Sequence, residues 1–267
     1  MDPFSEDDAG LAGRVAIVTG GGAAGDGIGN GRAACLLLAR AGTKVLVADR
    51  EFTLAERTAQ MIIAAGGTSF AMACDVTSDD QCKSLVEAAL DRYGRLDFLD
   101  NNVGIASPGD VLSTSIEQWR HIMLVNLESM FLMAKHAIPA MIKTSGGGAI
   151  VNISSIGALQ PKSNAAYAAA KGGVIALTRS IAADHGRVGI RANCVVPGSV
   201  ITPMVDNSAA SRAAKRAASL IDVEGTGWDT GHAVRFLLSN HARFITGQCL
   251  VVDGGTTRSY PVRRDRN

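Results

Sequence analysis

Tyr167 and Lys171 stand four residues apart in a segment expected to be helical, so their side chains share one face of the helix. A free tyrosine titrates near pH 10, which is too high for acid–base chemistry at neutral pH. A neighbouring ammonium group stabilises the phenolate and lowers that pKa. Ser154 or Ser155 ends the preceding apolar segment, so its hydroxyl could reach the same place. The spacing taken alone is also that of a solvated helix face, so the pair is a candidate for general acid–base chemistry.

A glycine-rich stretch, residues 20–29, follows the first apolar segment and leads into a helix expected from about Asn30. Glycines let the backbone approach a pyrophosphate, and the N-terminus of the next helix favours its negative charge. Asp49 closes the second apolar segment at the offset expected of a ribose-binding acid. Asp49 would repel a 2′-phosphate, so NAD(H) is favoured over NADP. Arg50 is the contrary observation, because it could reach such a phosphate.

These residues need a scaffold in which strands and helices alternate. The expected strands are continuously apolar, which suits a parallel sheet covered on both faces; they are 15–18, 44–48, 96–99, 149–153, 191–196 and 249–252, with a further strand before Cys74. The expected helices are 29–41, 53–65, 79–92, 115–142, 164–184 and 229–239, of which 115–142 is long enough to be bent. This alternation predicts an α/β fold with a doubly wound parallel sheet, a Rossmann fold, and ligands at the carboxyl ends of its strands.

Composition excludes several classes of protein. The 267 residues include 26 Lys and Arg against 25 Asp and Glu, and 47% are hydrophobic, which argues against disorder and against a nucleic-acid-coating surface. No linker or repeat divides the chain, so we expect one domain over 13–257 between a flexible tail (1–12) and a basic tail (258–267). The start lacks a secretory signal, no apolar run could span a membrane, and five unpaired-looking cysteines suit reduced thiols. We therefore expect a soluble cytoplasmic protein with no metal site, since the histidines show no ligand spacing.

Several motifs together resemble the short-chain dehydrogenase/reductase family, and the resemblance runs from about Gly13 to Gly255. In chain order they are the glycine loop after Val18, Cys74-Asp75-Val76, Asn101-Asn102-Val103-Gly104, Asn126, Ser154, Tyr167 with Lys171, and Pro197 to Thr202.

The resemblance implies roles for four catalytic residues. Tyr167 would exchange a proton with the substrate oxygen while hydride moves to or from the nicotinamide, and Lys171 would lower the Tyr167 pKa and hold the nicotinamide ribose. Ser154, 13 residues before Tyr167, would hydrogen-bond the substrate oxygen, and Asn126 would position a relay water. The residues expected to contact the cofactor are Gly20, Gly27, Ile28, Gly29, Asp49, Arg50, Asp75, Val76, Asn102, Val103, Gly104, Tyr167, Lys171, Pro197, Gly198, Val200 and Thr202.

The chain departs from the family pattern in three places. The glycine loop is longer by three residues, so Gly27-Ile28-Gly29 is the chosen pyrophosphate motif and Gly25-Asp26-Gly27 the alternative. Asp100 stands where the family usually has an apolar residue, and a carboxylate there needs a partner or a raised pKa. Val103 replaces an alanine and could crowd the adenosine ribose.

The sequence says less about the substrate-binding part of the site than about the cofactor-binding part. Residues 203–225 are expected to form a small helical lid, and its cations Arg212, Lys215 and Arg216 either attract an anionic substrate group or form a solvated helix face. The other expected walls are 105–108 and 157–162.

These features predict an NAD(H)-dependent oxidoreductase that interconverts a secondary alcohol and a ketone. A redox-neutral isomerase, epimerase or lyase on the same fold is the alternative, followed by an NAD-binding scaffold without catalysis. The family resemblance implies a homotetramer or homodimer, in which the long helix and the Tyr167 helix pack against their copies.

Overall fold

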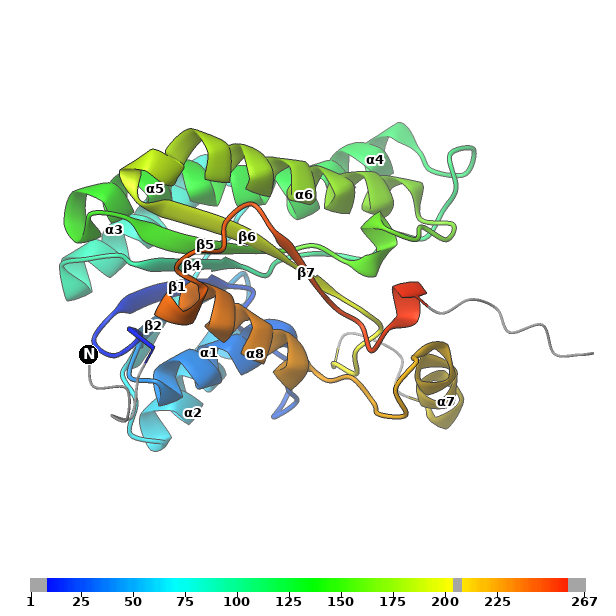
Figure 1. The fold of residues 1–267 in the computed structure, drawn as a ribbon, viewed down its shortest axis with the longest axis horizontal. Helices are drawn as coiled ribbons and strands as arrows, with labels where there is room; N and C mark the ends of the chain where they lie inside the picture. Colours follow the sequence, from blue (N-terminus) through cyan, green and yellow to red (C-terminus); the bar gives the residue numbers. More distant parts are fainter. Residues whose placement is uncertain (1–8, 204–207, 259–267) are drawn as a thin grey trace, which may run out of the picture.

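A seven-stranded parallel sheet forms the centre of the molecule, in the order β3-β2-β1-β4-β5-β6-β7 (Figure 1). The structure is a computed structural model that describes residues 9–203 and 208–258. Its strands are β1 (Val15–Thr19), β2 (Lys44–Asp49), β3 (Ser69–Ala73), β4 (Phe98–Asn101), β5 (Gly148–Ile153), β6 (Ile190–Pro197) and β7 (Cys249–Val252). The doubly wound α/β architecture is confirmed, including the strand expected before Cys74.

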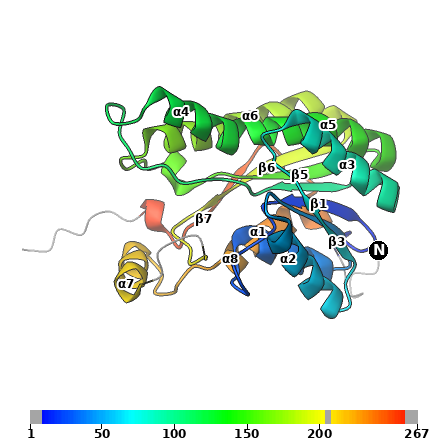
Figure 2. The ribbon, with the colours of Figure 1, turned by 180° about the vertical axis from the view of Figure 1, so that it is seen from behind.

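Helices cover both faces of this sheet, as Figures 1 and 2 show: α1, α2 and α8 on one face, α3 to α6 on the other. Their bounds are α1 (Asn30–Arg40), α2 (Phe52–Ala64), α3 (Asp79–Tyr93), α4 (Ile116–Met123), α5 (Ser129–Ser145), α6 (Ala165–His185) and α8 (Gly227–Leu238). α7 (Ala209–Ala218) lies apart from these layers, beyond the carboxyl ends of the strands (Figure 1).

Alternate residues of β1 enter two different cores. Val15 and Ile17 pack with α3 and α5, whereas Ala16 and Val18 pack with α1 and α8, and all four are fully buried. A strand enclosed on both sides must be apolar at every position, which is why its sequence shows no alternation.

The long helix predicted over 115–142 is bent by a π-helical segment. α4 ends at Met123, the π segment runs over Leu124–Glu128, and α5 continues to Ser145. A π turn accommodates one extra residue within a helix and often marks a functional site. Here it carries Asn126, which is completely buried.

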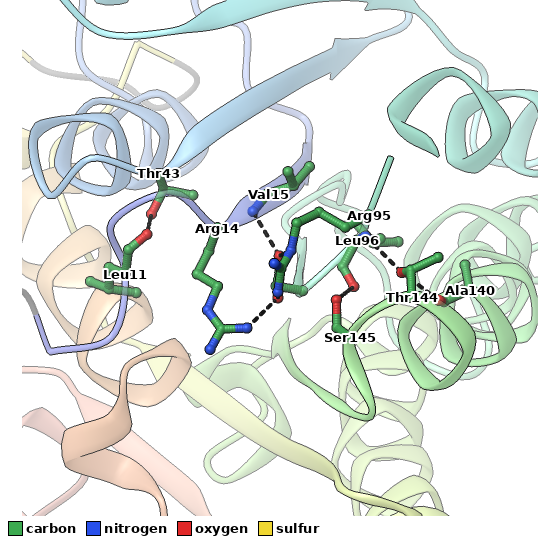
Figure 3. Close-up of polar contacts among 10 residues, drawn as sticks. Leu11, Arg14, Val15, Thr43, Arg95, Leu96, Ala140, Thr144 and Ser145 are labelled. Atoms are coloured by element: carbon green, nitrogen blue, oxygen red, sulfur yellow. Dashed lines mark hydrogen bonds and ion pairs between the residues drawn. The ribbon is translucent and has the colours of Figure 1, made fainter. Parts of the chain in front are cut away.

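The amino-terminal residues differ from the tail expected over 1–12. Leu11 is fully buried and its carbonyl accepts a hydrogen bond from the Thr43 hydroxyl at 3.0 Å (Figure 3). Residues 9–12 therefore belong to the folded unit, because Leu11 completes the core beneath α1. Residues 1–8, and the Arg263, Arg264 and Arg266 part of the basic tail, lie outside the described residues.

Within the described chain, every helix is too short or too polar to cross a bilayer.

Candidate active site

A cleft of about 570 Å³ opens at the carboxyl ends of the strands, where the fold predicts a ligand. Its size falls in the range of small-molecule and cofactor sites. It brings together many of the predicted cofactor residues, namely Gly20, Gly29, Asp49, Arg50, Asp75, Val76, Asn102, Val103, Gly104 and Thr202.

The glycine loop meets α1 at a point of very close packing. Gly20 adopts a positive φ of 64°, and a Cβ on Gly31 would come within 2.2 Å of the Gly20 carbonyl oxygen. Both positions therefore require glycine. Gly29, Asn30 and Gly31 line the cleft at the helix N-terminus.

Gly27 and Ile28, chosen as part of the pyrophosphate motif, are not among the residues that line the cleft, and neither are Gly25 and Asp26 of the alternative. Gly29, the last residue of the chosen motif, lines the cleft together with Asn30 and Gly31. Sequence reasoning did not select Asn30 and Gly31, although they overlap the expected helix start.

Asp49 is oriented by the backbone at the end of β2. Its Oδ2 accepts a hydrogen bond from the Gly22 N–H and its Oδ1 from the Glu51 N–H, both at 3.1 Å. A Cβ on Gly22 would lie 2.6 Å from Asp49 Oδ2, so the loop needs glycine there too. Glu51 also lines the cleft, which sequence reasoning missed, and it lies 3.8 Å from the exposed Arg50 guanidinium.

Asp75 follows β3 and is fixed by Thr77. Its Oδ1 accepts hydrogen bonds from the Thr77 hydroxyl at 2.7 Å and the Thr77 N–H at 2.9 Å, which lower the pKa of Asp75. The carboxylate therefore stays ionised at the edge of the cleft, beside Val76.

Tyr167 and Lys171 occupy successive turns of α6, with the Lys171 Nζ 5.9 Å from the centre of the Tyr167 ring. The Lys171 ammonium is buried and donates to the Ile153 carbonyl at 2.8 Å. Burial lowers the pKa of Lys171 to about 8 and raises the pKa of Tyr167, an effect that a hydrogen bond with Ser155 partly offsets. Desolvation of the phenol thus outweighs the lowering of the Tyr167 pKa that is expected from Lys171, and the net pKa of Tyr167 is raised.

The two serines after β5 have different partners. Ser154, the expected catalytic serine, is buried and its hydroxyl donates to the Lys171 carbonyl at 2.8 Å. Ser155 is the serine that hydrogen-bonds Tyr167, and its Oγ also accepts from the Gly157 N–H at 3.1 Å. The geometry therefore favours Ser155 over Ser154, since successive residues of an extended segment point to opposite sides.

Asn126 connects this end of the cleft to the π turn. Its Oδ1 accepts from the Ile105 N–H at 3.0 Å, and its Nδ2 donates to the carbonyls of Ile105 and Ile122. A Cβ on Gly104 would lie 2.8 Å from Asn126 Oδ1 and 2.9 Å from Lys171 Nζ. Gly104, which lines the cleft, therefore lies directly beside Lys171; Lys171 and Tyr167 are not themselves among the residues that line the cleft.

Comparison with known proteins places this arrangement in a family. A family model described as enoyl-(acyl carrier protein) reductase matches residues 21–257. The chain belongs to the short-chain dehydrogenase/reductase family. It is 38% identical to a 2,5-dichloro-2,5-cyclohexadiene-1,4-diol dehydrogenase of Sphingobium indicum over 92% of this chain and 98% of the relative. It is also 38% identical to a cyclohexanol dehydrogenase of an Acinetobacter species, over 91% of this chain and 95% of the relative.

A solved structure supports the same family assignment. A 7α-hydroxysteroid dehydrogenase in complex with NADH and 7-oxo glycochenodeoxycholic acid is 31% identical and superposes with a TM-score of 0.87, covering 94% of this chain and 97% of the other.

Asp100 distinguishes this short-chain dehydrogenase/reductase from the family pattern. It is fully buried in the central strand β4, where burial raises its pKa to about 8 and a hydrogen bond from Asn102 partly lowers it. The Asn102 Nδ2 donates to Asp100 Oδ2 at 2.6 Å. The carboxyl therefore has both a hydrogen-bond partner and a raised pKa, the two features expected of a buried carboxylate. The partner, Asn102, lies two residues along the chain.

Three predicted cofactor residues lie elsewhere. Gly198 and Val200 line a second cavity of about 140 Å³ beneath α7, and Pro197 ends β6 beside β7. Gly198 is packed against Asp253, whose Cα would lie 2.7 Å from an added Cβ. The second cavity, rather than the large cleft, is thus the immediate surrounding of Gly198 and Val200.

The cations of the expected lid are already paired in part. Arg212 and Arg216 of α7 form ion pairs with Glu224 and Asp222 of the segment that follows. Arg212, Lys215 and Arg216 also line the second cavity, so attraction of an anionic group and a solvated face both stay predictions. Residues 204–207 of the lid lie outside the described residues.

The remaining predictions concern walls, metals and thiols. Ile105 lines the cleft, and Gly157 packs against the Tyr167 ring. No cluster able to hold a metal ion occurs among the described residues. All five cysteines are free, and all but Cys249 are buried.

Proposed function

We propose that this chain is an NAD(H)-dependent dehydrogenase that interconverts a cyclic secondary alcohol and the corresponding ketone. The observation that carries the proposal is the placement of Tyr167 and Lys171 beside a cofactor-sized cleft, whose lining residue Gly104 lies against Lys171. The names of the relatives, which act on cyclohexanol and a cyclohexadienediol, support a ring alcohol.

The cleft residues suit a dinucleotide. Glycines that admit no Cβ line one wall, a helix N-terminus supplies positive potential for a pyrophosphate, and the oriented Asp49 carboxylate suits a ribose diol. Asp49 and the neighbouring Glu51 disfavour a 2′-phosphate, which supports NAD over NADP. When bound, the nicotinamide would accept or supply the hydride.

The chain's own residues would handle the proton. Tyr167 accepts the alcohol proton during oxidation and returns it during reduction, while the Ser155 hydroxyl beside it would turn from the phenol to donate to the same substrate oxygen. The Lys171 ammonium favours the phenolate and would hold the ribose nearby. Asn126, whose contacts fix Ile105 beside Gly104, would support a water behind Lys171.

Substitutions in the three hydroxyl residues test this chemistry. We expect Tyr167→Phe to reduce the turnover of cyclohexanol with NAD by about 10²–10⁴-fold while NADH binding, followed by fluorescence, persists. Ser155→Ala should reduce kcat by roughly 10²-fold or more, and its matched control Ser154→Ala should have a much smaller effect. Unchanged turnover in Tyr167→Phe would refute the proposal. Substrate conversion without any net change in free NADH would instead indicate a redox-neutral isomerase.

Cofactor choice is tested by titrating the protein separately with NADH and NADPH. We expect NADH to bind roughly tenfold more tightly or better, because two carboxylates lie where a 2′-phosphate would sit. Asp49→Ser should reduce the ratio of the NADPH Kd to the NADH Kd, whereas Arg50→Ala should leave this ratio unchanged or increase it. Tighter binding of NADPH would mean that Arg50 overrides Asp49.

We also propose that the protein is a homotetramer or homodimer. Large apolar side chains are exposed on α5 (Phe131, 51%) and α8 (Trp228, 37%; Phe236, 40%). Such side chains on helix faces are what a second copy would cover.

A further inference from the structure

Arg32, in the first turn of α1, is among the largest fully buried side chains of the described chain. Its Nη1 donates to the carbonyls of Gly25 and Gly27, and its Nη2 to the carbonyl of Ala23, each at 2.7 Å. Its Nε donates to the Thr58 hydroxyl at 2.9 Å. Three of these four acceptors belong to the lengthened glycine loop.

Thr58 on α2 extends the same network. Its hydroxyl accepts from Arg32 and donates to the Gly21 carbonyl at 2.8 Å. The carbonyls of every second loop residue, from Gly21 to Gly27, are thereby turned towards Arg32 and Thr58. The loop has no strand or helix to satisfy these groups, so the guanidinium takes that role.

Fixing the carbonyls also fixes the N–H groups. In a planar trans peptide the C=O and N–H point in opposite directions, so the N–H groups of Gly22 and Ala24 are turned away from Arg32. Gly22 and Ala24 line the cleft, and the Gly22 N–H meets Asp49. Arg32 therefore holds the Ala23–Ala24 peptide with its N–H turned towards the cleft, where it can bind an anion, while the Gly22 N–H orients Asp49.

The charge of Arg32 is not neutralised by contact. All its hydrogen bonds go to neutral oxygens, and Asp26, the acid that most affects it, is paired with Arg57 at 2.7 Å. A buried cation without a bonded carboxylate is costly. An anion bound over the loop would offset that cost.

We propose that Arg32 is a positioning residue for the cofactor diphosphate: it holds the 21–27 loop so that the Ala24 N–H faces the cleft and the Gly22 N–H orients Asp49, and it places a positive charge beneath the loop. This inference rests on the proposed dinucleotide site and deepens it. It also assigns a role to the extra loop residues, because their carbonyls accept hydrogen bonds from Arg32.

The test compares ligands with and without phosphate. NADH, ADP-ribose and adenosine are titrated into the wild type, Arg32→Met, Arg32→Lys and the control Arg40→Met, which changes an exposed arginine of the same helix. We expect Arg32→Met to weaken NADH and ADP-ribose by about 10–100-fold and adenosine by less than about threefold. Arg40→Met should bind all three ligands as the wild type does.

Two further measurements separate charge from folding. Arg32→Lys keeps the charge but carries its donors on a single nitrogen, so it cannot reproduce the planar fork that reaches three carbonyls and the Thr58 hydroxyl. It should therefore retain the salt dependence of ADP-ribose binding that Arg32→Met loses. Equal weakening of adenosine and ADP-ribose in both variants, or no weakening in either, would overturn the inference. ADP-ribose supports no turnover, so Arg32-dependent binding to a catalytically inactive wild type would refute the proposed function and still support this role.

Discussion

Asp100 is the residue whose environment is most at odds with its chemistry. Asp100 lies on β4 between β1 and β5 in the middle of the sheet, and its buried carboxyl accepts from Asn102 at Oδ2, while Oδ1 has no hydrogen-bond partner in the described chain. Burial is the main cause of its raised pKa of about 8, and Asn102 lowers it only in part. At neutral pH the group is therefore mostly protonated and spares the core an ionised carboxylate.

This predicts a specific dependence of stability on pH. Because the folded pKa is raised, the stabilising contribution of neutral Asp100 is complete below the unfolded pKa near 3.9 and is lost as the pH rises to about 8. Relative to Asp100→Asn, we expect the wild type to lose about 3–5 kcal/mol of unfolding free energy across that window. Urea unfolding at pH 5 and 8.5 measures it, with the exposed Asp91→Asn as control. A difference independent of pH would contradict the raised pKa.

At the same scale, the serines show where sequence reasoning reaches its limit. The sequence placed a hydroxyl at the end of β5, but spacing alone selected Ser154. The choice depends on which way consecutive side chains turn after the strand, and that is set by contacts with Lys171 and Tyr167 from another element. Likewise, the partner of Asp100 was adjacent in sequence, yet only the fold shows Asn102 turning back to it.

Elements were more predictable than contacts, because apolar periodicity reports burial directly. The strands and helices follow the pattern closely, and the length of 115–142 indicated a bend. The π turn itself depends on Asn126 bonding to Ile105, a residue 21 positions away, so no local pattern revealed it. β4 starts at Phe98 rather than Leu96, since the Leu96 N–H is taken by the Thr144 hydroxyl before the ladder begins.

The glycine loop is the element that sequence described least well. Its composition indicated a pyrophosphate site, with Gly27-Ile28-Gly29 as the chosen motif and Gly25-Asp26-Gly27 as the alternative. Arg32 holds the carbonyls of Gly25 and Gly27, and Gly29 is the residue of the chosen motif that lines the cleft. In a lengthened loop, the glycines that face the ligand cannot be identified from spacing alone, because side chains from other positions decide which loop carbonyls turn inward.

Across the whole molecule, the two edges of the sheet have different roles. The carboxyl edge holds the cleft, while the amino edge holds a buried carboxylate, Asp97, that ties separate segments together (Figure 3). Asp97 accepts from Arg14 at 2.8 Å, from Arg95 at 2.6 and 2.8 Å, and from the Val15 N–H at 2.9 Å. Burial raises the pKa of Asp97, but these hydrogen bonds outweigh it and the net pKa is lowered.

This division predicts that stability and cofactor binding can be changed separately. Asp97→Ala should lower the unfolding free energy by about 2–4 kcal/mol, somewhat under the value for a fully buried pair because Arg14 and Arg95 are partly exposed. The deficit should be complete above the ordinary carboxyl pKa near 3.9 and shrink as the pH falls through the lowered folded pKa. Urea unfolding at pH 7 and pH 3.5 measures both.

The exposed Asp79, paired with Lys135 and His136 on the surface, is the matched comparison, and Asp79→Ala should have a clearly smaller effect. Since Asp97 lies at the opposite edge of the sheet from the cleft, the folded Asp97→Ala protein should bind NADH with the wild-type Kd at a temperature well below its Tm. A weakened Kd under those conditions would show that the two edges are coupled, and that the strands between them transmit the loss of the Asp97 contacts to the glycine loop.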